Sequence, residues 1–404
     1  MRGNMCGDRN LRALCCALVV LVIGGQEAWC NHPVNARGSA QAEKTETQKP
    51  SDAEEWTKKG YALLEEGKPQ EAVAALQRAV EADRKNIKGY VGLGNALMRL
   101  KRYDEAIDAF RTAVRLNPVV ADFHLALGGA YLESGRYTEA QQSFLRAAEL
   151  NPEDVRAHLA VGDALSRGGD YARARAAYIR AIGFAPGRAA PYVALGNLNV
   201  QEAKYADARI AFEAAMRLEA DNNEARLGLA SALSGLNQHT EAEQIVRAVL
   251  AQNPKDVTAL STLAQVLDHA GKSDEAINTY QEILKLTPDD PYAWGNLGWV
   301  QYRAGRYEDA VRSSRKALEI EGRLPYVFFN LGLIYAVQND WRSAQKEYQK
   351  GVQIGVLTDI RAGIKDVREA MQKQPASSAL RRALEYLITE ERRALDKKQL
   401  AIQQ

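Results

Sequence analysis

The sequence predicts an all-α solenoid of antiparallel helix pairs that ends in a C-terminal capping helix pair. From residue 53 to residue 358, a pattern of 34 residues fits nine times without insertion or deletion. Within each copy, two stretches carry apolar residues at helical spacing, and a short turn separates them. A fixed period of this length is typical of repeat proteins, in which each unit packs only against its neighbours.

The nine copies define the expected repeat boundaries. Positions are numbered from 1 at the first residue of each copy, and the first and second helices of a copy are called helix A and helix B. The copies are residues 53–86, 87–120, 121–154, 155–188, 189–222, 223–256, 257–290, 291–324 and 325–358.

Two positions carry small residues throughout. Position 8 is glycine in seven copies and alanine in two, and position 20 is alanine in all nine. Glycine inside a helix costs roughly 0.5–1 kcal/mol relative to alanine. Its recurrence therefore predicts a close helix crossing, where a larger side chain would cost about 1–3 kcal/mol.

The remaining positions place the two helices. Apolar residues lie at positions 4, 7 and 11 and again at positions 21, 24, 27 and 28, and both sets follow one face of a helix. Positions 15 to 17 predict a turn, as in Gly135-Arg136-Tyr137. Proline at position 32 of five copies marks the end of helix B.

One copy shows the complete motif of a known family, with a single departure. Positions 4, 7, 8, 11, 20, 24, 27 and 32 of residues 121–154 are His124, Leu127, Gly128, Tyr131, Ala140, Phe144, Ala147 and Pro152. Only the histidine replaces the usual aromatic residue, and the chain resembles the tetratricopeptide repeat family from residue 53 to residue 358. The resemblance implies a right-handed superhelix. It also implies that positions 2, 5, 9, 12 and 13 of helix A line a concave groove that binds protein segments.

Departures from the motif concentrate at the two ends of the array. They are Lys59, Arg84, Gly351 and Val356. Terminal repeats face solvent on one side, so atypical residues are expected there.

Residues 359–404 are predicted to form a degenerate tenth repeat and a capping helix. With two residues inserted, Ile364, Val367 and Met371 take positions 4, 7 and 11, and leucines 380, 384 and 387 take positions 20, 24 and 27. Ser377 or Ser378 is expected to cap the last helix, which should extend to about residue 399.

Residues 1–36 have the outline of a secretory signal peptide. Three arginines precede an apolar run of 11 residues at 13–23, and cleavage after Ala36 fits better than cleavage after Ala28. A bilayer span needs about 20 apolar residues. We therefore expect export to the periplasm or the extracellular space, with an uncleaved inner-membrane anchor as the alternative.

The cysteines and the following linker fit an exported chain. Cys6, Cys15, Cys16 and Cys30 all lie before Ala36. Cleavage there excludes disulfides, thiol catalysis and cysteine-bound zinc from the mature chain. Residues 37–52 are polar and lack aromatic residues, which predicts a disordered linker.

Charge and motifs exclude several functions. The 53 basic residues nearly balance the 51 acidic ones, and without a basic block we do not expect nucleic acid as a partner. No P-loop, dinucleotide-binding glycine motif or HExxH occurs, so neither a cofactor nor enzymatic activity is expected. His124 and His158 occupy position 4 of adjacent copies, but a metal would need a further ligand. Packing in the aromatic site is therefore predicted for both.

The predicted partner-binding site lies in the eighth and ninth copies, where aromatic residues gather on the groove positions of helix A. Two asparagines at position 6 lie beside them as hydrogen-bond partners for a bound backbone. The site residues are Tyr292, Asn296, Trp299, Tyr302, Tyr326, Phe329 and Asn330. Tryptophan and tyrosine dominate interface hot spots. The alternative is that the C-terminal helix folds over these rings and makes them part of the cap.

These observations predict a non-catalytic scaffold or assembly factor of the bacterial cell envelope, which binds a protein or an extended peptide in its groove. The bacterial assignment rests on the absence of any Asn-x-Ser/Thr glycosylation acceptor. Membrane insertion of the mature chain is not expected. The alternative is a structural homo-oligomer that assembles through the terminal repeats or the C-terminal helix.

Overall fold

The computed structural model describes residues 52–403, which form twenty α-helices and, within that range, no strand. They fall into two compact units. Of the described residues, the first unit holds 52–202 and 210–221, and the second holds 203–209 and 222–403. The predicted signal peptide, and the predicted linker except for its last residue, lie outside the described residues.

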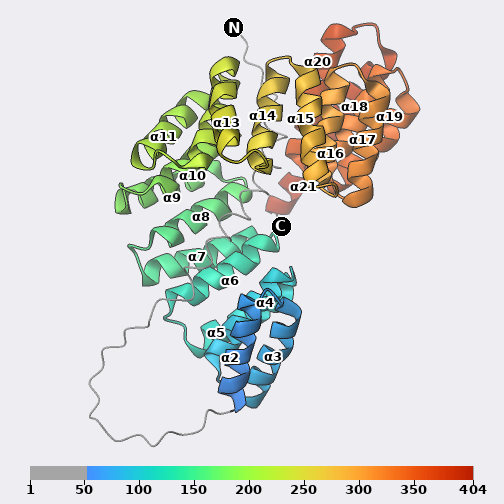
Figure 1. The fold of residues 1–404 in the computed structure, drawn as a ribbon. Helices are drawn as coiled ribbons and strands as arrows, with labels where there is room; N and C mark the ends of the chain where they lie inside the picture. Colours follow the sequence, from blue (N-terminus) through green and yellow to red (C-terminus); the bar gives the residue numbers. More distant parts are fainter. Residues whose placement is uncertain (1–51, 404) are drawn as a thin grey trace, which may run out of the picture. The chain divides into compact units, whose positions relative to one another are not determined.

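The first unit contains the helices of the first copies (Figure 1). They are α2 Asp52–Glu65, α3 Pro69–Ala82, α4 Ile87–Arg99, α5 Tyr103–Leu116, α6 Ala121–Glu133, α7 Tyr137–Leu150, α8 Val155–Arg167, α9 Tyr171–Phe184 and α10 Ala189–Gln201. Helix α11, Tyr205–Leu218, contributes residues to both units.

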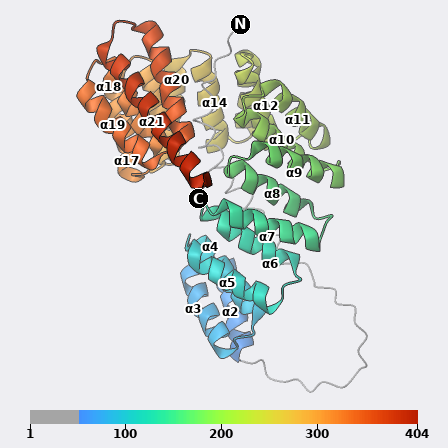
Figure 2. The same cartoon turned by 180° about the vertical axis from the view of Figure 1, so that it is seen from behind.

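The second unit contains the later copies and the two C-terminal helices, with α21 beside α18 and α19 (Figure 2). Its helices are α12 Asn223–Gly235, α13 His239–Gln252, α14 Val257–His269, α15 Ser273–Leu286, α16 Pro291–Arg303, α17 Tyr307–Ile320, α18 Pro325–Val337, α19 Trp341–Ile354, α20 Leu357–Lys373 and α21 Ser378–Gln403.

Within each unit, a helix B packs against helix A of its own copy and helix A of the next, as α15 does between α14 and α16. The predicted all-α fold of stacked helix pairs is confirmed. No described helix combines the length and the apolar character that a membrane span requires.

Glycine at position 8 lets a ring from helix B lie directly on the backbone of helix A. A Cβ atom built on Gly128 would lie 2.5 Å from the Phe144 ring, and one built on Gly196 would lie 2.7 Å from the Phe212 ring. The alanine at position 20 is fully buried in every copy. The close crossing inferred from the small residues is thus filled by the residue at position 24 of the same copy.

Adjacent glycines in α6 provide a test of this packing. A Cβ on Gly128 meets the Phe144 ring, whereas a Cβ on Gly129 meets nothing within 4 Å. Gly129→Ala should stabilise the protein by roughly 0.5–1 kcal/mol. Gly128→Ala should leave it about 1–3 kcal/mol less stable than Gly129→Ala, because helix propensity cancels and only the clash remains. Urea denaturation of both variants measures the difference, and equal stabilities would contradict the packing.

The turn between the two helices uses a left-handed residue at position 15 in all nine copies. Five of these residues are glycine. The other four, with φ between 55° and 63°, are Lys101, Ala203, Asn237 and Asn339. Left-handed backbone is strained for residues with a Cβ atom, and asparagine tolerates it better than lysine or alanine.

Ala203→Gly should therefore raise the stability, by about 0.5–1 kcal/mol, because glycine removes the strain at φ 55°. The reverse change at the same position of another copy, Gly305→Ala at φ 75°, should lower it by a similar amount. Thermal unfolding should show a higher midpoint for Ala203→Gly and a lower midpoint for Gly305→Ala than for the wild type. A lower midpoint for Ala203→Gly would show that position 15 is not strained.

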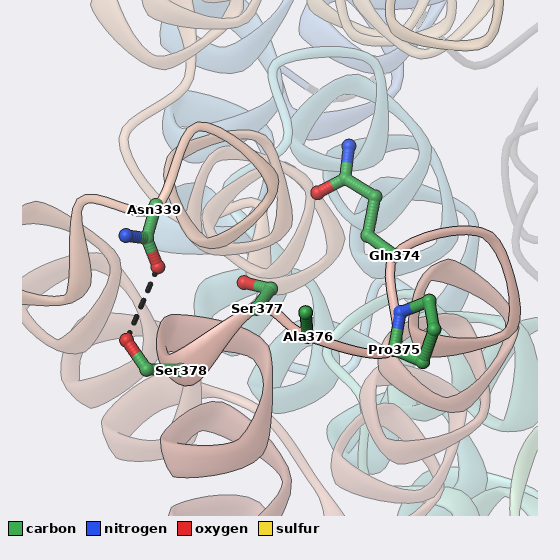
Figure 3. Close-up of a pocket in the computed structure, with 6 residues that line it drawn as sticks. All are labelled: Asn339, Gln374, Pro375, Ala376, Ser377 and Ser378. Atoms are coloured by element: carbon green, nitrogen blue, oxygen red, sulfur yellow. Dashed lines mark hydrogen bonds between the residues drawn. The ribbon is translucent and has the colours of Figure 1, made fainter.

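The last two helices close the second unit. Ser377 caps α21, since its Oγ accepts a hydrogen bond from the Leu380 amide at 3.3 Å. Asn339, in the turn after α18, adds a second cap. Its Oδ1 accepts from the Ser378 hydroxyl at 3.3 Å (Figure 3). It also accepts from the Ala379 amide at 3.2 Å. The pocket lined by Asn339, Ser377 and Ser378 is thus the start of α21, where the Ala379 and Leu380 amides already have hydrogen-bond partners.

Candidate functional site

The structure divides the seven predicted site residues into a buried group and a partly exposed group. Helix α16 carries four of them and α18 carries three. Asn296, Phe329 and Asn330 are 5%, 1% and 3% exposed. Tyr292, Trp299, Tyr302 and Tyr326 are half-buried.

Phe329 lies inside the C-terminal cap. Its ring is held between the backbones of α19 and α20, where a Cβ atom on Gly351 would lie 3.0 Å away and one on Gly363 would lie 2.7 Å away. The ring also packs at 6.1 Å from the Tyr348 ring. Gly351, which departs from the motif, thus makes room for Phe329. For this residue the structure favours cap packing over partner contact.

The asparagines at position 6 are buried as well. Asn296 forms a hydrogen bond with the hydroxyl of Tyr280, which also bonds to Gln265. Burial is the main cause that raises the pKa of Tyr280, so this hydroxyl stays protonated and the network stays neutral. Asn296 and Asn330 therefore belong to the helix packing, and neither offers an amide to a ligand backbone in this conformation.

Trp299 and Tyr302 form an edge of the cap that remains partly open. Their ring centroids are 5.3 Å apart, and Tyr302 lies 6.0 Å from Tyr307. Both pack against the apolar cluster that contains Phe329, Val367 and Leu387. One side of each ring is thus packed on the cap, and both residues remain only half-buried.

Tyr292 and Tyr326 belong to a second, smaller cluster around Val327 and Leu331. The Tyr326 hydroxyl lies directly over Gly295, where any Cβ atom would collide with it. Position 5 is therefore glycine in the eighth copy to admit this tyrosine. The four half-buried rings define what we call the ring edge: Tyr292, Trp299, Tyr302 and Tyr326.

The two histidines have backbone partners. The Nε2 atoms of His124 and His158 lie 2.9 Å and 2.8 Å from the carbonyl oxygens of Pro118 and Pro152, and both rings are buried. His158 also stacks on Phe184 at 4.9 Å. Among residues 52–397, no group of three histidine, cysteine or acidic residues is arranged to hold a metal.

The bonds from position 4 to a proline carbonyl were not predicted from the sequence. The Trp294 indole donates to the Pro288 carbonyl at 2.9 Å, and the Tyr192 hydroxyl donates to the Pro186 carbonyl at 3.3 Å. In these four copies, position 4 thus ties helix A to the proline at position 32 of the preceding copy. The sequence feature that could have predicted these bonds is that histidine, tyrosine and tryptophan, the residues at position 4 of these copies, can all donate a hydrogen bond.

A buried polar chain in the second unit was also missed. The Ser234 hydroxyl lies 2.9 Å from His269 Nδ1, and Arg303 pairs with Asp268 at 2.7 Å. Burial lowers the pKa of His269 to about 4, aided by the charge of Arg303, and burial raises the pKa of Asp268 against the pull of the same arginine. These residues link three successive helices A, so their role is structural.

Comparisons with known proteins agree with this repeat packing. Tetratricopeptide repeat models match residues 53–86 and residues 261–322. The chain is a tetratricopeptide-repeat protein. The model of the C-terminal domain of cilia and flagella-associated protein 70 matches residues 91–287 of this tetratricopeptide-repeat protein. None of the curated proteins matches its sequence.

Three solved structures are similar to parts of this tetratricopeptide-repeat protein. PilF of Pseudomonas aeruginosa is 18% identical over 53% of this chain and 97% of its own, with a TM-score of 0.43. MamA from Desulfovibrio magneticus RS-1 is 22% identical over 43% of this chain and 98% of its own, with a TM-score of 0.40. A chain of the APC/C heterotetramer Cut9-Hcn1 is 17% identical over 82% of this chain and 55% of its own, with a TM-score of 0.45.

Proposed function

We propose that this tetratricopeptide-repeat protein is a scaffold without catalytic activity of its own, which binds a segment of another protein at the ring edge. The single observation behind the proposal is that four aromatic rings on the groove positions of α16 and α18 stay half-buried. Aromatic side chains bring large contact area at low entropic cost, and they dominate binding hot spots.

The ring edge is also held in place before any partner arrives. The cap cluster fixes one side of Trp299 and Tyr302, and Gly295 seats the Tyr326 hydroxyl. A partner therefore loses little entropy in ordering these side chains. An extended or helical segment that lays apolar side chains across the rings fits this surface best.

Photo-crosslinking locates the partner surface. Benzoylphenylalanine in place of Trp299 should capture a partner in the source cells. The same group in place of Gln281, at position 25 of helix B in the seventh copy, is the control. Capture at both positions alike, or at neither, would contradict a partner site at the ring edge.

With the captured partner in hand, the double variant Trp299→Ala/Tyr302→Ala should weaken its binding by clearly more than the roughly 30-fold expected for one ring, because each truncated hot-spot ring costs about 2 kcal/mol or more. Calorimetric titration of partner into wild type and variant measures this. The matched control is Tyr171→Ala, a ring on α9 in the first unit that is 37% exposed. An affinity unchanged in the double variant would remove the ring edge from the binding site.

We also propose that the protein works in the cell envelope, on the strength of the basic and apolar pattern of residues 1–36. N-terminal sequencing of protein from the envelope fraction should give a chain that begins at Arg37. An intact Met1 in the membrane fraction would favour the anchored alternative, and protein confined to the cytosol would contradict export.

A further inference from the structure

Helix α9 differs from every other described helix B in its charge. Its sequence, YARARAAYIRAIGF, contains three arginines and no acidic residue. Each of the other eight helices B from α3 to α19 contains at least one aspartate or glutamate. The basic character is therefore specific to the fourth copy.

Exposed aliphatic residues accompany this charge. Ile179 is 54% exposed on α9, Leu145 is 37% exposed on α7, and Ile210 is 58% exposed on α11. Leu145 and Ile179 share position 25, and Ile210 lies at position 22, one helical turn away on the same face. The other copies carry polar residues at position 25: Gln77, Arg111, Glu213, Arg247, Gln281, Arg315 and Gln349.

Position 25 points toward the following copy: Arg111 donates to the Tyr131 hydroxyl of α6 at 2.8 Å, and two ion pairs reach helix B of the next copy. Arg247 reaches Glu275 of α15 at 3.5 Å, and Arg315 reaches Glu347 of α19 at 2.7 Å. By the same geometry, Leu145 lies toward α9. We call the exposed aliphatic residues of α7, α9 and α11, together with Arg180, the α9 strip: Leu145, Ile179, Arg180 and Ile210.

The arginines of α9 are not equally engaged. Arg173 pairs with Asp170 at 3.5 Å, and Arg175 pairs with Glu202. Arg180 is exposed, and no carboxylate between residues 52 and 397 forms an ion pair with it. It directly follows Ile179, so an aliphatic anchor and an unneutralised cation lie next to each other.

We infer that the α9 strip binds a second protein segment, separate from the ring edge, that is acidic and carries aliphatic side chains. The aliphatic residues supply apolar contact, and Arg180 selects a carboxylate. Two copies of this chain would bring like charges together across a twofold axis, which opposes self-association. An anionic membrane gains only about 1 kcal/mol per basic residue, so one unneutralised arginine favours a protein partner.

The test uses the full chain with benzoylphenylalanine in place of Ile179, photolysed in the source cells, and mass spectrometry of the adduct. The control carries the same group in place of Lys316, at position 26 of α17. We expect a crosslinked segment with net negative charge and aliphatic residues. A synthetic peptide of that segment should bind the wild type, and its affinity should fall about tenfold or more in Ile179→Ser/Arg180→Glu.

Matched controls separate this site from its alternatives. Lys316→Glu makes the same charge change elsewhere and should leave peptide affinity unchanged, and circular dichroism confirms that both variants are folded. The inference is overturned by a lipid adduct, by an adduct with a second copy of this chain, or by a yield no higher than at Lys316. Trp299→Ala/Tyr302→Ala should not change the affinity for this peptide. A negative result for the α9 strip can therefore be told apart from a negative result for the ring edge.

Discussion

Replacing Phe329 with alanine should destabilise the second unit by about 3–5 kcal/mol, the usual cost of removing a fully buried aromatic ring. The ring is 1% exposed and fills the space between Gly351 and Gly363, so its removal leaves a cavity bounded by backbone that cannot move in to fill it. The loss should concentrate in α18 to α21, because repeat proteins are stabilised mainly by contacts between neighbours.

Hydrogen exchange resolved by helix measures this loss, together with urea denaturation. The matched control is Phe184→Ala on α9, whose ring is 45% exposed and stacks on His158. It should cost about 1 kcal/mol. Equal losses in the two variants, or a Phe329→Ala loss spread evenly over both units, would contradict the described cap.

Acidification should also destabilise the second unit, through His269. The pKa of this histidine falls from 6.5 to about 4 on folding, so the unfolded chain binds a proton in this window while the folded chain does not. The contribution of His269 to the free energy of unfolding should therefore be fully present above pH 6.5. It should fall by at most about 3 kcal/mol as the pH approaches 4. His239 acts in the same direction, and the raised pKa of Asp268 opposes it.

Urea denaturation of wild type and His269→Gln at several pH values between 7 and 4 tests this. Glutamine cannot take up the proton, but its amide can still either accept a hydrogen bond from Ser234 or donate one to it. The variant should lose markedly less stability across the window. Parallel pH profiles for the two proteins would show that His269 is not protected from protonation in the folded state.

The helix pairs could be predicted from the sequence because every copy carries small residues at the same two positions. Glycine or alanine at position 8 and alanine at position 20 indicate that helices A and B cross closely. Proline at position 32, where present, marks the end of helix B. The ring that fills the crossing and the left-handed residue at position 15 depend on three-dimensional contacts. They emerge only when the helices are placed.

The candidate site could be predicted only in part, because position 5 of helix A can face either the groove or a neighbouring element. The Phe329 side chain is buried because α20, which follows the last copy, places Gly363 against its ring. Gly351 was visible as a departure from the motif, and in retrospect it signalled a bulky neighbour. Asn296 was misjudged for a similar reason: its partner, Tyr280, lies in the preceding copy.

The most direct test of a binding surface at the ring edge compares Trp299→Ala with Phe329→Ala in two assays, partner affinity by calorimetry and unfolding of α18 to α21 by hydrogen exchange. Trp299→Ala should weaken binding about 30-fold with a small loss of stability, because its ring is half-buried at the edge of the cap. Phe329→Ala should have the larger effect on unfolding. If Trp299→Ala unfolds the cap as strongly as Phe329→Ala, or leaves the affinity unchanged, the ring edge is cap packing and not a binding surface.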